Sequence, residues 1–267
     1  MRYDTPGYGF FALSDSPKRR LPFLMTAVAL VLCGAFLYLK IDPAAALTAF
    51  PDFIRFFVRN FLPPDFQKIG TYLPLLRDTV LFAVTGTYLS AVLSFVFGLL
   101  LSEQTNRLAW VRAVVRVIVS FLRNVPVLAW AALLVYIFGI GNMVGLIALV
   151  FATLGFLSRS YAESVSEIAG AKLEALRACG ASYPQILFHG LIPEFVPAWI
   201  NWTLFSFEIN IRASAILGMV GAGGIGIMIQ TKIRLFQYRE ALSLIILLAG
   251  MVLITEFLTN NIRKQIR

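Results

Sequence analysis

The sequence has few charged residues for its length, and this shortage excludes most soluble folds. Only 14% of its 267 residues are charged and 59% are apolar, with a mean hydropathy of +0.80. Soluble domains carry about 25% charged and about 45–50% apolar residues, because polar groups must cover the surface that faces water. This chain instead needs lipid as its solvent, over several membrane-spanning helices.

Cysteine and histidine are also scarce, and motifs for catalysis are missing. The two cysteines lie in different settings, Cys33 in an apolar run and Cys179 in a polar loop, so neither a disulfide nor a metal site is expected. The single histidine, His189, has no second His or Cys nearby and is expected to be structural. The sequence contains no Walker-type phosphate loop, no H-E-x-x-H motif and no Ser–His arrangement. We therefore do not expect an enzyme, and any ATP chemistry must reside on another polypeptide.

The net charge of +9 raises the possibility of a nucleic-acid partner, which the distribution of the cations argues against. Clusters such as Lys18-Arg19-Arg20 and Arg263-Lys264 flank apolar runs, as membrane orientation requires. The sequence shows no basic stripe interleaved with aromatic residues. We expect a lipid bilayer, and no nucleic acid, as the surrounding partner.

The apolar runs predict an all-α integral membrane protein with about six transmembrane helices. Residues 1–20 form a predicted cytoplasmic N-terminal segment, and residues 21–267 form one transmembrane domain. The first run, residues 21–39, could also be a cleaved signal peptide, but it is longer than the usual apolar region of about 7–15 residues. The predicted spans are 21–39, 79–102, a third from near Ala113, a fourth up to 158, 195–219 and 239–259.

Two segments between or within these spans have distinctive patterns. Residues 52–61 place phenylalanines on one helical face and arginines on another, which is typical of a short helix in the bilayer interface. The third span places Arg123 and Asn124 inside the membrane, with Pro126 just after them to kink the helix.

Six spans put both termini on one side of the membrane. Lysine and arginine are more frequent in the segments on that side, so the positive-inside rule makes it the cytoplasm. The prediction is a multi-pass protein of the cell inner membrane, with both termini cytoplasmic.

The long polar segment of about residues 159–194 is a predicted cytoplasmic loop with a helix–turn–helix form. Its first helix covers residues 162–179, and Gly180 is placed to terminate it. Ser182 is a suitable cap for a second helix, with Pro184 in its first turn and an end at Pro193. The second helix is short, apolar and exposed, and such a surface calls for a protein partner that buries it.

The loop contains the sequence Glu174-Ala175-Leu176-Arg177-Ala178-Cys179-Gly180, nine further residues, and then Gly190-Leu191-Ile192-Pro193. This pattern resembles the EAA motif of binding-protein-dependent ABC importer permeases. The departures are Leu176 for the second alanine, Gly190 for the usual isoleucine and Ile192 for leucine. The resemblance implies a type I ABC importer permease fold whose loop docks into a cytoplasmic ATPase. It implies ATPase-coupling roles for Glu174, Ala175, Gly180, Ile186, Leu187 and Pro193.

Four other stretches are distinctive: Arg123-Asn124-Val125-Pro126, the segment 61–66, Glu208-Ile209-Asn210-Ile211-Arg212 and the glycine-rich segment 217–226. Together they are similar to the phosphonate permease (PhnE-type) branch of that family. The resemblance implies import of a phosphonate or related phosphorus oxyanion. The implied partners are an ABC ATPase dimer, a second permease copy or paralogue, and an extracytoplasmic substrate-binding protein. This chain itself would bind no cofactor, because ATP and Mg belong to the ATPase.

The charges inside the predicted membrane helices have two interpretations. Glu208 and Arg212 are four residues apart, which favours an ion pair on one helix face and lowers the cost of burying either charge. Alternatively Arg212, together with Arg123, faces a pathway for an anion, since the planar guanidinium matches oxyanions. The candidate pathway residues are Arg123, Asn124, Glu208, Asn210, Arg212, Gly221, Gly223 and Gly224.

Residues 221–226 also satisfy the G-x-G-x-x-G string of dinucleotide-binding proteins, with Glu240 downstream. That fold needs a strand before the turn, whereas here a membrane helix precedes it. We expect the glycines to permit non-helical backbone and close helix approach at a gate or pathway wall.

Two alternative functions stay open at this level. One is an ABC permease for another small solute, such as an amino acid, because the EAA loop does not distinguish cargoes. The other is a secondary transporter driven by an ion gradient, against which the exposed apolar loop helix argues.

Overall fold

The computed structural model describes residues 17–40, 42–168 and 171–266, and every regular element within these ranges is helical. The chain divides after Arg59 into two compact units, which are described separately. Four helical runs in the described ranges are by themselves long and apolar enough to cross a bilayer. Two bent helix pairs raise that number to six, in agreement with the predicted all-α membrane fold.

The first unit consists of α1 (Pro17–Tyr38) and most of α2 (Pro43–Phe61). The apolar side chains of α1 are exposed, among them Leu30, as expected of a helix whose solvent is lipid. α2 contains the predicted amphipathic segment, in which the Phe53 and Phe57 rings stack with centroids 6.4 Å apart. The helical prediction for residues 52–61 is therefore confirmed, and their position in the bilayer interface stays a prediction.

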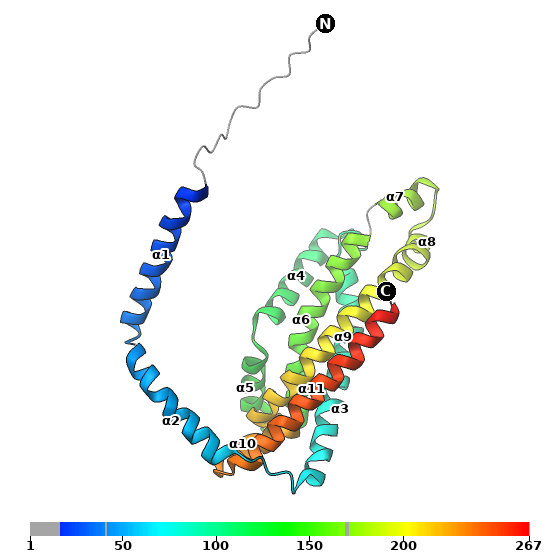
Figure 1. Ribbon diagram of the computed structural model, residues 1–267. Helices are drawn as coiled ribbons and strands as arrows, with labels where there is room; N and C mark the ends of the chain where they lie inside the picture. The colour runs from blue at the N-terminus through cyan, green and yellow to red at the C-terminus, as the bar shows by residue number, and fades with distance from the viewer. Residues whose placement is uncertain (1–16, 41, 169–170, 267) are drawn as a thin grey trace. The chain divides into compact units, whose positions relative to one another are not determined.

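The core of the second unit is a long pair of helices, α3 (Ile69–Leu101) and α6 (Asn142–Ile168) (Figure 1). Small residues of α3 at four-residue spacing, Gly86, Ser90, Ser94 and Gly98, are buried along the contact. Such residues allow membrane helices to approach closely. The Ser94 hydroxyl also donates to the carbonyl oxygen of Leu154 across the helix pair, at 3.2 Å. α3 begins ten residues before the predicted span. The prediction counted only the uncharged run after Asp78, whereas Arg77 and Asp78 are exposed, paired and already helical.

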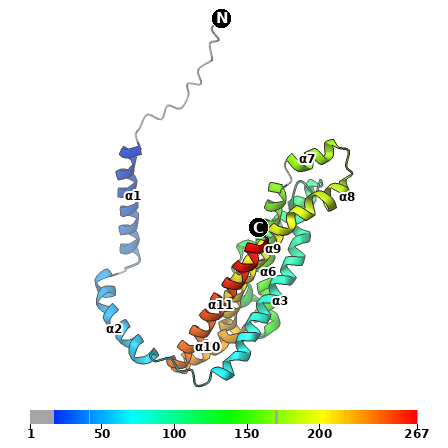
Figure 2. The same ribbon diagram turned by 45° about the vertical axis from the view of Figure 1, so that its right-hand side comes forward.

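Two further long helices complete this core. α9 (Ile192–Leu217) packs against both α3 and α6, and α11 (Tyr238–Ile266) packs against α9 (Figure 2). One end of the bundle carries the short helices α7 and α8 together with the C-terminus, while α10 lies at the opposite end (Figure 1). The predicted coupling loop therefore lies at one end of the bundle, and the glycine-rich segment that leads into α10 lies toward the other.

The third predicted span is broken in two rather than merely kinked. α4 (Ala109–Asn124) and α5 (Val127–Phe138) meet at an angle of 90°. Val125 is extended, with φ −84° and ψ 120°, as expected before a proline. Pro126 also lacks the amide that would continue the hydrogen bonds of α4. The bend brings the end of α4 and the start of α5 to one place.

The glycine-rich segment forms the turn between α9 and α10 (Gly224–Arg234), through a π-helical stretch, η2 (Gly218–Ala222). Gly223 has φ +93°, and a Cβ on it would lie 2.0 Å from Oδ1 of Asn142. Gly221 and Gly224 also have positive φ values, of 106° and 71°. The prediction of non-helical backbone and close helix approach is confirmed, whereas a role in a gate stays a prediction.

Candidate functional site

The predicted coupling loop is built as a helix, a turn and a second helix. α6 continues to Ile168 and α7 covers Ala171–Ala178, so both described parts of the helix expected over residues 162–179 are helical, and residues 169–170 lie outside the described ranges. Gly180 has φ +78° and ends α7, as predicted. The backbone amide and hydroxyl of Ser182 both donate to Oε1 of Gln185, at 2.8 and 2.9 Å. This arrangement fixes the start of α8 (Tyr183–Gln185).

The predicted end of the second helix at Pro193 is wrong, because the helix continues into the membrane. α8 leads into a π-helical stretch, η1 (Ile186–Leu191), and then directly into α9, so that Tyr183–Gly221 is one helical run. The amide of Ile192 donates to the carbonyl oxygen of Leu187, five residues earlier. This wider turn accommodates the neighbouring Pro193, because a proline has no amide to donate to the regular helical ladder. The end of the coupling loop is therefore continuous with a membrane helix.

The apolar side chains of η1 differ in their exposure to solvent. Ile186, predicted to contact the ATPase, is only 6% exposed and packs in a core cluster with Leu157, Tyr161 and Phe195. Its predicted role is therefore corrected to anchoring the loop on α6 and α9. Phe188, which belongs to the apolar second helix predicted to be exposed, is 61% exposed instead. Glu174, Ala175, Gly180 and Pro193 are exposed, and Leu187 is half-buried.

A second candidate site lies at the break between α4 and α5. A cavity of about 290 Å³ is lined there by residues of α4, α5, α6 and α9. Arg123 and Asn210, both predicted pathway residues, lie on its wall. Asn124 is exposed and donates to the carbonyl oxygen of Ser120 at 2.8 Å, without lining this cavity. A Cβ on Gly155 would lie 2.5 Å from the backbone nitrogen of Arg123, so only glycine permits this packing of α6 against α4.

Asn210 forms hydrogen bonds that join three helices beside this cavity. Its side chain is 3% exposed, accepts a hydrogen bond from Thr153 at 3.0 Å and donates one to Thr87 at 2.8 Å. A buried amide with both groups paired stabilises one arrangement of helices. Asn210 thus forms the wall of the cavity and fixes α3, α6 and α9 around it.

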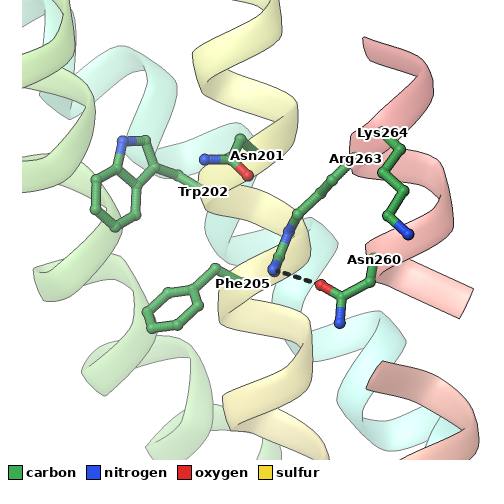
Figure 3. Close-up of a pocket in the computed structure, with 6 residues that line it drawn as sticks. All are labelled: Asn201, Trp202, Phe205, Asn260, Arg263 and Lys264. Carbon is green, nitrogen blue, oxygen red and sulfur yellow. Dashed lines mark hydrogen bonds between the residues drawn. The ribbon is translucent and has the colours of Figure 1, made fainter. Parts of the chain in front are cut away.

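Glu208 pairs with a different arginine from the one predicted. Its Oε1 lies 2.8 Å from Nη2 of Arg263 on α11, and it also accepts a hydrogen bond from Thr259. The Arg263 guanidinium points from α11 toward α9 and donates to Oδ1 of Asn260 at 3.3 Å, beside a cavity of about 450 Å³ (Figure 3). The predicted Glu208–Arg212 pair is wrong, because α11 supplies a closer cation.

Arg212 is exposed and forms no ion pair within the described residues. It lines a cavity of about 190 Å³ whose wall includes two carboxylates, Glu208 and Glu256. These carboxylates repel an anion at that position. The structure therefore separates the two predicted arginines: the cavity of Arg212 has two acidic lining residues, and the cavity of Arg123 has none.

Glu240, the downstream acid of the apparent dinucleotide motif, has a structural role. It binds Lys232 and Lys68 at 2.7 and 2.8 Å and accepts a hydrogen bond from Tyr72 at 2.7 Å. The hydrogen bond and charge of Glu240 raise the pKa of Lys68. Helices flank the glycines on both sides, which agrees with rejection of the nucleotide interpretation. The described residues also contain no group of three His, Cys, Asp or Glu side chains that could hold a metal.

Comparison with known proteins identifies the family. Residues 94–267 match the family described as the binding-protein-dependent transport system inner membrane component. The chain belongs to this family. It is therefore the inner-membrane permease component of an ABC importer, a class whose members work with an ATPase and a substrate-binding protein.

Relatives and solved structures agree with this membership. The chain is 29% identical to the phosphite transport system permease protein PtxC of Stutzerimonas stutzeri, over 93% of this chain and 90% of that protein. It is 34% identical to the phosphate-import permease protein PhnE of Mycolicibacterium smegmatis, over 76% of this chain and 39% of that protein. An inward-facing structure of the MetNI methionine ABC transporter shares the fold, with a TM-score of 0.60, 24% identity and coverage of 72% and 96% of the two chains.

Three residues of these sites escaped sequence reasoning. Ser206 lines the Arg123 cavity, Arg263 pairs with Glu208, and Gly155 allows α4 to approach α6. The first two lie on helices whose mutual rotation is set by tertiary packing, so no local spacing indicates them. Gly155 could have been noticed as a small residue in an apolar helix, which is a common sign of close packing.

Proposed function

We propose that this permease imports a phosphorus oxyanion, such as phosphite or a phosphonate. The observation that carries the proposal is the position of Arg123, on the wall of a cavity at a helix break that has no acidic lining residue. An arginine in such a setting favours a small anion over a zwitterionic or cationic solute. The relatives named as phosphite and phosphate permeases support the same class of cargo.

The transport mechanism follows from the coupling loop. Two permease chains, identical or paralogous, would each present one loop to an ATPase dimer, with both termini in the cytoplasm. ATP-driven closure of the ATPases moves the loops, and the continuous run Tyr183–Gly221 carries this movement to the membrane depth of Asn210. The pathway then opens alternately toward an extracytoplasmic binding protein and toward the cytoplasm. ATP and Mg act on the ATPase, and this chain needs no cofactor of its own.

The residues of the coupling loop would contact the ATPase, and those of the Arg123 cavity would contact the anion. Exposed Glu174, Ala175 and Phe188 form the surface for the ATPase, while Ile186 fixes that surface to the bundle. Arg123 and Asn210 form the wall that the anion passes. Contacts there must be weak, because a tightly held anion would not be released.

Co-purification with the ATPase and binding protein encoded beside this chain tests the proposal. We expect a stable complex, and we expect the binding protein to bind phosphite or a phosphonate in preference to methionine and glycine betaine. Absence of the ATPase from the purified complex would refute the coupling mechanism. Binding of methionine alone would refute the cargo and leave the permease assignment intact.

A further inference from the structure

Ser206 carries a buried hydroxyl without a hydrogen-bond partner. The side chain is 2% exposed, and its Oγ makes no hydrogen bond to any described residue. It lies on the wall of the Arg123 cavity. On the same helix, by contrast, the Ser214 hydroxyl donates to the carbonyl oxygen of Ile211 at 2.8 Å. Buried polar groups are nearly always paired, so a hydroxyl left open on a cavity wall indicates a missing acceptor.

The N-terminus of α5 opens on the same cavity. Val125, Pro126 and Val127 all line it. The first backbone hydrogen bonds of this 12-residue helix run from Ala129 and Trp130 to the carbonyl oxygen of Pro126. The preceding amides, of Val127 and Leu128, therefore have no carbonyl of their own helix to bind. Amides at a helix start carry partial positive charge, and broken membrane helices use such ends to bind anions.

Arg123 adds a full positive charge at this break. It lies in the last turn of α4, lines the cavity and forms no ion pair within the described ranges. Gly155 of α6 allows the backbone of Arg123 to pack closely against that helix. Residues that carry three kinds of donor, the Arg123 guanidinium, the first amide of α5 at Val127 and the Ser206 hydroxyl, thus line one space without a competing carboxylate.

We infer that this cavity is a transit site for a tetrahedral oxyanion, bound by Arg123, the first amides of α5 and the Ser206 hydroxyl. The inference rests on the proposed function for the phosphorus identity of the anion, but the donors would accept any oxyanion of that shape. The cavity volume is about 290 Å³, whereas one water needs roughly 10–15 Å³ by the same kind of measure. The cavity therefore has room for the anion together with several waters, and water-mediated contacts of that kind are compatible with release.

The test uses the complete complex in nanodiscs, with the permease carrying Cys33→Ser and Cys179→Ser so that no native thiol reacts. Ser206→Cys then places a thiol in the cavity, and its reaction with a small methanethiosulfonate is timed with and without inorganic phosphite. With phosphite at about ten times its Kd, we expect occupancy of the site to slow the reaction about tenfold. Adding Arg123→Gln should abolish this protection. Unchanged labelling in phosphite, or protection that survives Arg123→Gln, would overturn the site.

Measuring both phosphite uptake and melting temperature for Ser206→Ala distinguishes a loss of anion binding from a loss of folding. Ser158 offers a matched control, because its hydroxyl is also buried and unpaired but does not line this cavity. We expect both alanine variants to keep the melting temperature, and only Ser206→Ala to lower uptake of phosphite, by about tenfold. Equal uptake by the two variants would overturn the site.

The two proposals fail in different ways. If the wild-type complex imports phosphite while Ser206→Ala and Arg123→Gln do so at the same rate, the transit site is refuted and the proposed function stands. If the wild type imports no phosphorus oxyanion but phosphite or sulfate still protects the thiol at position 206, the site stands and the proposed cargo is refuted.

Discussion

The side chain of Leu176 lies directly over Gly190, so that a Cβ on the glycine would be 2.6 Å from Cδ1 of the leucine. These two residues are departures from the EAA motif, which has alanine and isoleucine at the corresponding positions. The larger residue at one position fills the space left by the smaller residue at the other. The contact joins α7 to η1, and thus holds the two parts of the coupling loop together.

Exchange of these two residues tests that packing. Gly190→Ile alone should push α7 away and lower ATP-dependent uptake several-fold, because branched carbon atoms cannot share the space of Leu176. The double variant Leu176→Ala with Gly190→Ile should recover most of the uptake. Failure of the second substitution to rescue the first would show that the contact does not set the loop geometry.

Ile186 and Phe188 should respond to alanine substitution in opposite ways. Ile186→Ala leaves a cavity in the core and should lower the free energy of unfolding by about 2–5 kcal/mol. Phe188→Ala removes an exposed ring, so stability should hold while affinity for the ATPase falls by roughly tenfold, as for an aromatic interface anchor. Thermal unfolding and binding to the purified ATPase check the two results. A stable Ile186→Ala variant with weak ATPase binding would restore the original assignment of Ile186.

The Glu208–Arg263 pair should matter more for stability than Arg212 does. The side chains of Glu208 and Arg263 are 13% and 21% exposed, so Glu208→Ala leaves a largely buried charge unpaired and should cost roughly 3 kcal/mol. Arg212→Ala should change stability by less than about 0.5 kcal/mol, as expected of an exposed residue without an ion pair. Unfolding of the two variants in detergent decides the matter. An equal loss for both would mean that Arg212 also holds the helices together.

Close packing at Gly155 should be necessary for the position of Arg123. Gly155→Ala forces the backbone of α4 away and should cost about 1–3 kcal/mol. Gly250→Ala is the matched control, because nothing lies within 4 Å of a Cβ there. Its effect should be neutral or slightly stabilising, since alanine is the better helix former. Melting temperatures give the comparison, and tolerance of Gly155→Ala would contradict the packing.

Much of the fold follows from features that are local in sequence. Apolar run length predicts the membrane helices, and Gly180 and Ser182 predict the turn of the coupling loop. Pro126 predicts a break in the third span, although a 90° bend exceeds the expected kink. Each of these effects depends on backbone chemistry within a few residues.

The partners of individual side chains could not be predicted in the same way. Glu208 has a cation four residues away, yet it binds Arg263, which is 55 residues distant. Ile186 looks like an exposed apolar residue in a polar loop, but continuity of η1 with α9 turns it into the core. Both outcomes depend on the rotation of one helix against another, which a single sequence does not specify.

Uptake of radiolabelled phosphite by proteoliposomes containing the permease, its ATPase and its binding protein tests the central claim most directly. The account predicts uptake that requires both ATP and the binding protein, and that falls about tenfold with Arg123→Gln, the size expected for one charge-assisted contact. Uptake that persists without ATP, or a complex that moves methionine but neither phosphite nor a phosphonate, would contradict it.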